Sequence, residues 1–330
     1  MQQSTLKKLS EILGISISTV SRALKDHPDI SSATKAKVKE LAIAMEYEPN
    51  AYAVQLRTRQ SNVLGVSVPS IRNYFYDSFI AAIEEEARQF GYSVLIMQSG
   101  DNAATEAANL QVFRKNMVVG VFAAITTGTE DMAAFQKMED LSIPLVFADR
   151  VPELGGYTKV TMNDVEAATM AAEAIIRSGK KKVLALFGHP NLILTKLRQD
   201  AFIKTFKEQS PETELVVYNP DTTDPAHDLA LEVLQRKERP DVIFCMGDLI
   251  LMGVMKATFD LNLKVPKDIS IISISNGFIP TLYRPQVTYV ETSGYKLGKL
   301  AFKQMMARLK NQPVEETAYI ESVLVEGGSL

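Results

Sequence analysis

Apolar residues recur at helical spacing through the first sixty positions and predict three short helices. The first runs over 6–13 with its apolar residues on one face, and Gly14 favours the left-handed turn that ends such a helix. Ser16 is a suitable N-cap for a second helix over 17–25, and Ser31 or Ser32 begins a third that reaches about residue 45. Two helices joined by a short glycine turn are typical of a helix-turn-helix, whose second helix enters the major groove of DNA.

The outward face of the second helix carries side chains that suit DNA. Arg22 can present its forked guanidinium group to O6 and N7 of guanine, and Ile17 can pack against a thymine methyl group. Hydroxyl groups on this helix can bond phosphates. Two amphipathic helices around a glycine also arise by coincidence, so these residues alone leave a purely structural interpretation open. The side chains concerned are Ile17, Ser18, Thr19, Ser21 and Arg22.

From residue 61 the pattern changes to short apolar runs that alternate with amphipathic stretches. Strands are expected at 63–68, 93–97, 118–124, 145–148, 183–187, 214–217, 242–246 and 270–274. The stretches between them predict helices, so the alternation indicates parallel sheets with crossover helices. The pattern starts again near residue 164, which indicates two α/β lobes with a ligand cleft at the carboxyl ends of their strands.

Several short motifs follow one another along the whole chain. The first part carries Thr5-Leu6, Gly14-Ile15-Ser16, Thr19-Val20-Ser21-Arg22-Ala23-Leu24, Tyr47-Glu48-Pro49-Asn50 and Gln55-Leu56-Arg57. The rest carries Gly65-Val66, Asn73-Tyr74-Phe75-Tyr76, Asp149-Arg150, Leu197-Arg198, Gly247-Asp248 and Arg284-Pro285-Gln286-Val287-Thr288. In this order and spacing they resemble the LacI/GalR (lactose-repressor) family of bacterial transcriptional regulators.

The resemblance implies a fold and a division into domains. An all-α helix-turn-helix head is expected at 1–48 and a hinge helix at 49–60. An effector-binding and dimerisation core is expected at 61–330, built as two doubly wound parallel-sheet lobes like a periplasmic binding protein. The N-lobe would take about 61–160 plus 290–320 and the C-lobe about 161–289 plus 321–330, with crossings near 160, 290 and 320.

The resemblance also implies how DNA is bound. Leu56, from a hinge helix ordered only on DNA, would wedge into the minor groove at the centre of a near-palindromic operator. Prying a base step apart costs a few kcal/mol, which the contacts of the bent DNA offset. Two such wedges require a homodimer. The C-terminal residues show no heptad pattern, so a coiled-coil tetramer is not expected. The implied DNA-binding residues are Thr5, Ile17, Ser18, Thr19, Ser21, Arg22, Thr34, Asn50, Ala53, Leu56 and Arg57.

Seven positions of the core are candidates for binding a small-molecule effector, by resemblance a sugar or sugar derivative. Tyr74 and Phe75 would form an aromatic wall, and polar anchors would orient the ligand. Four of them also have a plain structural interpretation: the two aromatic residues as core, Asp149 as a turn residue and Arg198 as part of a surface ion pair. Ser275-Asn276 stands where the family often has Asp-Asp, which puts the identity of the effector in doubt. The candidates are Tyr74, Phe75, Asp149, Arg198, Asp248, Ser275 and Asn276.

Charge and composition change this picture little. Residues 1–60 hold nine Lys and Arg against six Asp and Glu, whereas the whole chain has a net charge of −3. A basic head on an acidic body suits a DNA-binding module, although the asymmetry alone is weak evidence. One cysteine excludes an intramolecular disulfide, and no secretory signal or membrane span is evident. We therefore expect a cytoplasmic protein associated with the nucleoid.

The sequence offers no apparatus for catalysis. Phosphate-binding glycine loops are missing, and Cys245 with three scattered histidines, His27, His189 and His227, gives no metal-ligand spacing. We therefore expect no cofactor, no metal and no enzyme activity, with Cys245 buried and His189 facing the cleft. The alternatives are a two-lobed solute-binding protein, a Rossmann-type enzyme, and a regulator whose core binds a protein co-repressor.

Overall fold

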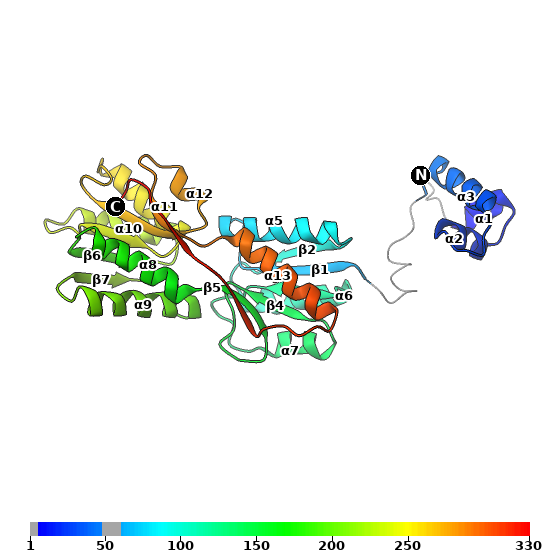
Figure 1. The fold of residues 1–330 in the computed structure, drawn as a ribbon, viewed down its shortest axis with the longest axis horizontal. Helices are drawn as coiled ribbons and strands as arrows, with labels where there is room; N and C mark the ends of the chain where they lie inside the picture. Colours follow the sequence, from blue (N-terminus) through cyan, green and yellow to red (C-terminus); the bar gives the residue numbers. More distant parts are fainter. Residues whose placement is uncertain (1–5, 48–60) are drawn as a thin grey trace. The chain divides into compact units, whose positions relative to one another are not determined.

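The computed structural model describes residues 6–47 and 61–330. The chain divides into two compact units, Met1–Ser61 and Asn62–Leu330 (Figure 1). We describe each unit by itself. Within the described residues, no helix is both long and apolar enough to cross a bilayer.

The first unit is a small three-helix head. Its helices are α1 (Leu6–Leu13), α2 (Ile17–Leu24) and α3 (Ser32–Ala44). Ser16 caps α2 by accepting a hydrogen bond from the Thr19 amide at 3.1 Å, and Ser31 caps α3 in the same way. Five fully or nearly buried residues from the three helices form the core: Leu9, Val20, Ala23, Val38 and Ala42. The predicted helix-turn-helix is therefore confirmed.

The N-lobe of the second unit is a six-stranded parallel sheet in the order β11-β5-β4-β3-β1-β2. Helices α5 and α13 cover one face and helices α6 and α7 the other. The strands are β1 (Val63–Val68), β2 (Ser93–Gln98), β3 (Gly120–Ala123), β4 (Leu145–Ala148), β5 (Thr158–Met162) and β11 (Thr317–Ile320). The helices are α5 (Tyr74–Gln89), α6 (Ala103–Lys115), α7 (Ala133–Asp140) and α13 (Gly294–Leu309).

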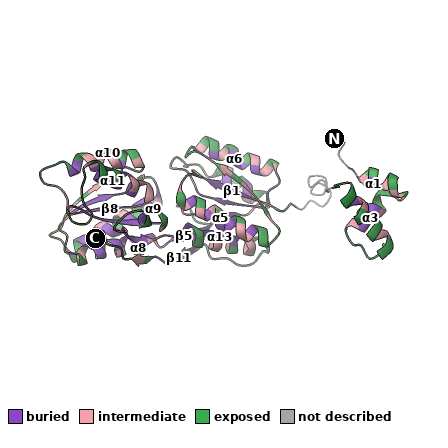
Figure 2. Ribbon diagram, turned by 90° about the horizontal axis from the view of Figure 1, so that it is seen from above, coloured by how far each residue is buried: buried purple, intermediate pink, exposed green. Residues whose placement is uncertain are grey.

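The C-lobe repeats this plan in the order β12-β10-β9-β8-β6-β7, and only the β10–β12 pair is antiparallel. In both lobes the central strands are buried between helices whose outer faces are exposed, whereas the edge strands β2 and β7 are partly exposed (Figure 2). The strands are β6 (Lys182–Leu186), β7 (Glu214–Tyr218), β8 (Val242–Cys245), β9 (Ser270–Ser275), β10 (Thr288–Glu291) and β12 (Val323–Val325). The helices are α8 (Asp164–Arg177), α9 (Ile193–Gln209), α10 (Thr223–Leu234), α11 (Asp248–Asp260) and α12 (Phe278–Thr281).

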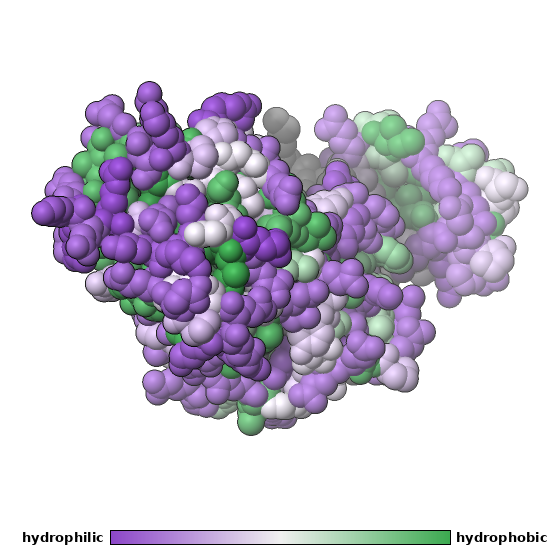
Figure 3. Space-filling view, turned by 60° about the vertical axis from the view of Figure 1, so that its left-hand side comes forward, coloured by the Kyte–Doolittle hydropathy of each residue, from purple (hydrophilic) through white to green (hydrophobic). Residues whose placement is uncertain are grey.

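The chain passes between the two sheets after Met162, after Glu291 and after Ile320. Each lobe is thus completed by segments that lie far apart in the sequence, as the path of α13 and β11 shows in Figure 1. The predicted fold class, helical head followed by two parallel-sheet lobes, is confirmed. Figure 3 shows a surface that is mostly hydrophilic, with apolar residues in small separate patches.

Helices α5 and α13 approach each other closely because α13 carries glycine at the contact. A Cβ built on Gly298 would lie 2.6 Å from the Phe79 carbonyl oxygen and 2.8 Å from the Ala82 Cβ. A Cβ on Gly294 would lie 2.2 Å from the Phe75 carbonyl oxygen. This close approach sets the start of α13 against the start of α5, at the edge of the cleft.

We expect Gly298→Ala to destabilise the N-lobe by about 1–3 kcal/mol, because the added methyl group must push the two helices apart. Gly128→Ala is a matched control, since its added Cβ would meet no heavy atom within 4 Å. Urea unfolding followed by circular dichroism measures both variants. An unchanged midpoint for Gly298→Ala would contradict the tight contact.

Candidate functional site

A cavity of about 470 Å³ lies between the two lobes, at the carboxyl ends of strands from both sheets. Open α/β sheets bind their ligands at this edge. Its polar lining includes Tyr76, Asp101, Asp149 and Arg150 from the N-lobe, and His189, Arg198, Asp248, Ser275 and Asn276 from the C-lobe. We call this cavity the effector cleft.

The N-lobe wall of the effector cleft is built around Asp149. This residue follows β4 in the left-handed conformation, with φ of +63°, which is uncommon for a residue other than glycine. The Tyr76 hydroxyl donates to Asp149 Oδ2 at 2.7 Å. Burial raises the pKa of Asp149. Asp149 is therefore a desolvated acceptor that lines the cavity and has one hydrogen bond already made.

Arg150 and Asp101 form an ion pair beside it. Arg150 Nη1 donates to Asp101 Oδ1 at 2.9 Å, and the Thr127 amide donates to the same oxygen at 3.0 Å. Behind this pair, Glu106 accepts hydrogen bonds from the Thr126 amide and the Thr129 hydroxyl. Burial raises the pKa of Glu106 to about 7, so its charge changes near neutral pH.

The C-lobe wall is built around a buried ion pair. Arg198 Nε donates to Asp164 Oδ1 at 2.7 Å, and both side chains are more than nine-tenths buried. Arg198 Nη1 also donates to the Met246 carbonyl oxygen at 3.2 Å. Burial raises the pKa of Asp164, and the neighbouring guanidinium group acts in the opposite direction. Loss of either partner would leave an unpaired buried charge.

The Ser275-Asn276 dipeptide holds Asp248 and joins the lobes. The Ser275 hydroxyl donates to one oxygen of the Asp248 carboxylate, and the Asn276 amide donates to the other at 3.1 Å. The Asn276 side chain then reaches the N-lobe, where its Nδ2 donates to the Tyr74 carbonyl oxygen at 3.2 Å and its Oδ1 accepts from the Gly294 amide at 2.8 Å. Asn276 is therefore a bridge between lobes as well as a lining residue.

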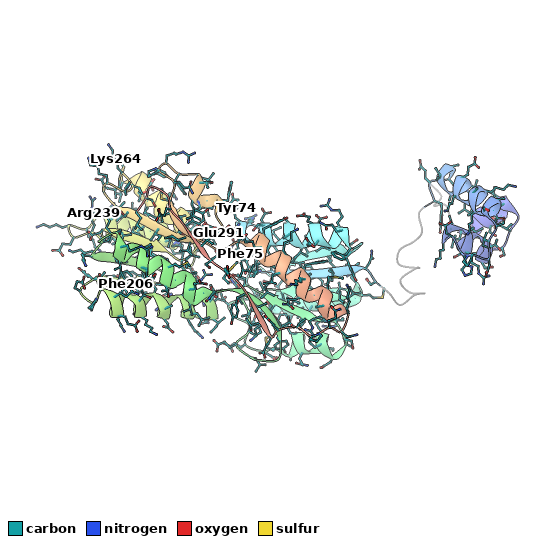
Figure 4. All side chains as sticks on the ribbon, in the orientation of Figure 1. Tyr74, Phe75, Phe206, Arg239, Lys264 and Glu291 are labelled. Carbon is teal, nitrogen blue, oxygen red and sulfur yellow. The ribbon has the colours of Figure 1, made fainter. Side chains whose placement is uncertain are left out.

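The structure brings six of the seven predicted effector residues together in the cavity lining: Phe75, Asp149, Arg198, Asp248, Ser275 and Asn276. Tyr74 is the exception. Its side chain is 41% exposed and its ring lies 5.3 Å from that of Phe278, so it packs between lobes outside the cavity wall. Tyr74 and Phe75 both lie at the start of α5, where the two lobes meet (Figure 4).

Sequence reasoning missed Tyr76, Asp101 and Arg150 as lining residues. Asp101 and Arg150 follow β2 and β4 within a few residues, and this position at the carboxyl ends of strands was the available signal. In the sequence Tyr76 stood out only as part of the Asn73-Tyr74-Phe75-Tyr76 motif, and the structure places it in the first turn of α5, which begins at Tyr74. Its hydroxyl group therefore lies near the cavity.

The other residues considered for chemistry are dispersed. His189 lines the effector cleft, whereas His227 bridges Asp228 and Asp260 outside it. Cys245 is fully buried, and burial raises the pKa of its thiol far above the usual range. Across residues 6–47 and 61–330, no three His, Cys, Asp or Glu side chains cluster as metal ligands.

The predicted DNA-binding residues of the head lie on or beside α2. Ile17 is 46% exposed, and the Arg22 side chain is 58% exposed, 4.0 Å from Asp29. Ser18 is also exposed, while Thr19, Ser21 and Thr34 are half-buried. Val20 and Ala23 face the core, which leaves the outward side of α2 available to a groove. Five further predicted residues lie outside the described part of the chain: Thr5, Asn50, Ala53, Leu56 and Arg57.

The raised pKa of Glu106 predicts how stability depends on pH. A carboxyl group that holds its proton more tightly in the folded state stabilises the fold below pH 4.5, and this contribution is lost as pH rises through about 7. Glu106→Gln should remove this fall in stability with rising pH, because glutamine can bond Thr126 and Thr129 without carrying a charge. We expect the variant to gain stability over the natural protein, reaching about 2–3 kcal/mol above pH 7.

Chemical unfolding at several pH values between 4.5 and 8 measures this gain. Glu130→Gln, which removes an exposed carboxyl group, is the control and should leave the pH dependence unchanged. A gain that stays constant with pH would show that the effect of Glu106→Gln is not titration.

Two family models match the chain. Residues 5–50 match the bacterial regulatory proteins of the lacI family, and residues 64–313 match the periplasmic binding protein domain. The second match spans most of the chain and covers both lobes that form the effector cleft. Together the two matches account for the helical head and the α/β core.

Similar proteins align along most of the chain. The ribose operon repressor of Bacillus subtilis is 27% identical over 315 residues, covering 96% of this chain and 94% of the relative. The lac repressor dimer bound to operator and the anti-inducer ONPF shares the fold, with a TM-score of 0.87, 20% identity and 99% coverage of both chains. A periplasmic binding protein/LacI transcriptional regulator from Alkaliphilus metalliredigens QYMF, complexed with D-xylulofuranose, has a TM-score of 0.71 and 21% identity over 82% of this chain and 99% of that one. These relatives are transcriptional regulators rather than enzymes, and the chain belongs to the lacI family of DNA-binding bacterial regulatory proteins, with a core of the periplasmic binding protein type.

Proposed function

We propose that this regulator is a repressor whose affinity for its operator is set by a sugar or sugar derivative in the effector cleft. The observation that carries the proposal is the convergence of polar anchors from both lobes on one cavity of about 470 Å³. A ligand that contacts both walls favours one arrangement of the lobes over another. Its effect on DNA is bounded by its differential affinity for the two arrangements.

The lining suits a molecule rich in hydroxyl groups. Asp149 and Asp248 supply carboxylate oxygens that accept hydrogen bonds, and Phe75 supplies an apolar face. The core matches a regulator that was complexed with D-xylulofuranose and aligns with a ribose operon repressor. We infer that the six lining residues Phe75, Asp149, Arg198, Asp248, Ser275 and Asn276 contact the effector.

The assembly that we propose is a homodimer on a near-palindromic operator. One head offers few contacts, and the related lac repressor binds its operator as a dimer. In this proposal the head spans 1–48, a hinge spans 49–60 and the core spans 61–330, with Leu56 of each hinge inserted into the minor groove. The dimer acts in the cytoplasm, at the nucleoid.

Arg22 is the residue that we expect to read a base in each half-site. Arg22→Ala should weaken operator binding by about 1–3 kcal/mol and relax the preference at one G·C pair, because the bidentate contact to guanine is lost. Arg22→Lys is the matched control: it keeps the charge and loses the fork, so it should lose the preference as well. Binding to a library of single-base operator variants measures both. Equal weakening on every sequence would make Arg22 a phosphate contact.

The response of the protein to its effector can be tested on the full chain. A thermal-shift screen of sugars, sugar phosphates and nucleobases on the full chain identifies the ligand, which should change operator affinity at least about tenfold. Arg198 should be required for this response. Because Arg198→Ala alone would leave Asp164 buried and unpaired, the informative variant is Arg198→Met with Asp164→Leu, which removes both charges.

We expect this double variant to bind the operator nearly as the natural protein does and to ignore the effector. The matched control is Arg88→Met with Glu84→Leu, which removes an exposed ion pair on α5. Titrations of labelled operator with and without effector measure all three proteins. A full response from the Arg198 double variant would contradict the assignment of the effector cleft.

A further inference from the structure

A second cavity, of about 440 Å³, lies next to the effector cleft and shares Asp149 with it. The Arg198–Asp164 pair stands between the two, since Arg198 lines the effector cleft and Asp164 lines the second cavity. Nothing in the proposed function uses this space. We call it the hinge cavity, because the strands β5 and β11 that form its floor lead into two of the three crossings between lobes.

The floor of the hinge cavity is a part of the N-lobe sheet that lies outside the core beneath α6 and α7. Lys159 pairs with Thr317 and Thr161 pairs with Tyr319 in the parallel β5–β11 ladder, so these side chains share one face of the sheet. Val160, between them, packs on the opposite face in the core beneath α5 and α13. The core beneath α6 and α7 contains residues of β3 and β4 but none of β5 or β11.

The walls of the hinge cavity are largely apolar. Ile193 and Leu197 come from the first turns of α9, and Val165 comes from the start of α8. Val151 and Pro152 close the N-lobe side. Leu197 and Val165 are 39% and 47% exposed, so apolar surface at the rim is open to solvent. The apolar part of a small ligand would bury this surface.

Lys159 is the feature that calls for a ligand. The residue is only 8% exposed, and its ammonium group has no hydrogen bond or ion pair with any residue that the structure describes. Three acidic groups share the cavity lining with it, of which two are paired with other cations and the third accepts a hydrogen bond from a hydroxyl group. Glu153 binds Lys196 at 2.8 Å, Asp164 binds Arg198 at 2.7 Å, and Asp149 accepts from the Tyr76 hydroxyl. Lys159 Nζ is not one of the fully buried polar atoms without a partner, so the ammonium group is open to the cavity, where an anion can pair with it.

We propose that the hinge cavity is a second binding site, for a small organic anion with an apolar body, such as an aromatic carboxylate. The carboxylate pairs with Lys159, and the hydroxyl groups of Thr161 and Thr317 lie on the same face to donate further bonds. The apolar body packs against Ile193, Leu197 and Tyr319. The proposal does not rest on the proposed function, although the two cavities share Asp149.

Benzoate and benzamide are matched probes, since they have the same shape and differ in charge. A Val165→Cys variant of the full chain, labelled with an environment-sensitive fluorophore, reports occupancy from the rim. The buried Cys245, whose thiol pKa is raised by burial, does not compete for the label. We expect a saturable response to benzoate at a concentration about tenfold lower than for benzamide, the value of one charge-assisted hydrogen bond.

Lys159→Met, made in the labelled protein, should abolish the preference for benzoate, and Lys159→Arg should keep it. Lys310→Met, which removes an exposed lysine beyond α13, is the control and should keep it as well. The proposal is overturned if benzoate gives no saturable response, or if the two probes bind equally. It is also overturned if Arg72→Gln, which removes a cation lining the effector cleft, abolishes the preference while Lys159→Met does not.

Discussion

The buried ion pair of Arg198 and Asp164 lies where the chain first enters the C-lobe. Asp164 is the first residue of α8 and follows the crossing from β5, while Arg198 projects from α9. Two charges so deeply buried are tolerated only when their hydrogen-bonding groups are largely satisfied, and here the guanidinium group also binds the Met246 carbonyl oxygen after β8. The pair therefore ties the crossing, a helix and a strand end together. Because it also separates two cavities, the arrangement of both depends on it.

The charges around the effector cleft are distributed unequally between its walls. Arg150 and Arg198 are each committed to a carboxylate, Asp101 and Asp164 respectively. Among the described residues, the Asp149 carboxylate has the Tyr76 hydroxyl as its one hydrogen-bonding partner, although both arginines act to lower its pKa. A ligand with hydroxyl groups can therefore bind Asp149 without disturbing an ion pair. A ligand carboxylate placed against Asp149 would meet an acceptor of the same charge.

The alternation of apolar runs was enough to predict both lobes, since a strand buried on two faces stands out in a parallel sheet. It was not enough for β5 and β11, whose exposed or polar residues, such as Lys159 and Tyr319, break the apolar pattern. The pattern also did not resolve α13, which fits against α5 through Gly294 and Gly298, residues that lower helix propensity. For the site, the motifs shared with the family located Asp149, Arg198 and Asp248, but no spacing distinguishes Tyr74 from Phe75 at the start of a helix. Only the packing of Tyr74 on Phe278 does so.

The Ser275-Asn276 dipeptide shows how a departure from the family pattern acts through its neighbours. In place of two carboxylates, this chain has the Ser275 hydroxyl group, which donates to Asp248, and the Asn276 side-chain amide, which donates to the N-lobe. The backbone N–H of Asn276 donates to Asp248 as well. Two acceptor positions of the Asp248 carboxylate are therefore occupied by donors of the protein, which leaves fewer for a ligand. The orientation of the effector then depends more on the N-lobe wall, where Asp149 is held by Tyr76. Asn276, meanwhile, accepts from the amide at the start of α13 and donates to the start of α5, so the same dipeptide that lines the effector cleft also joins the two lobes.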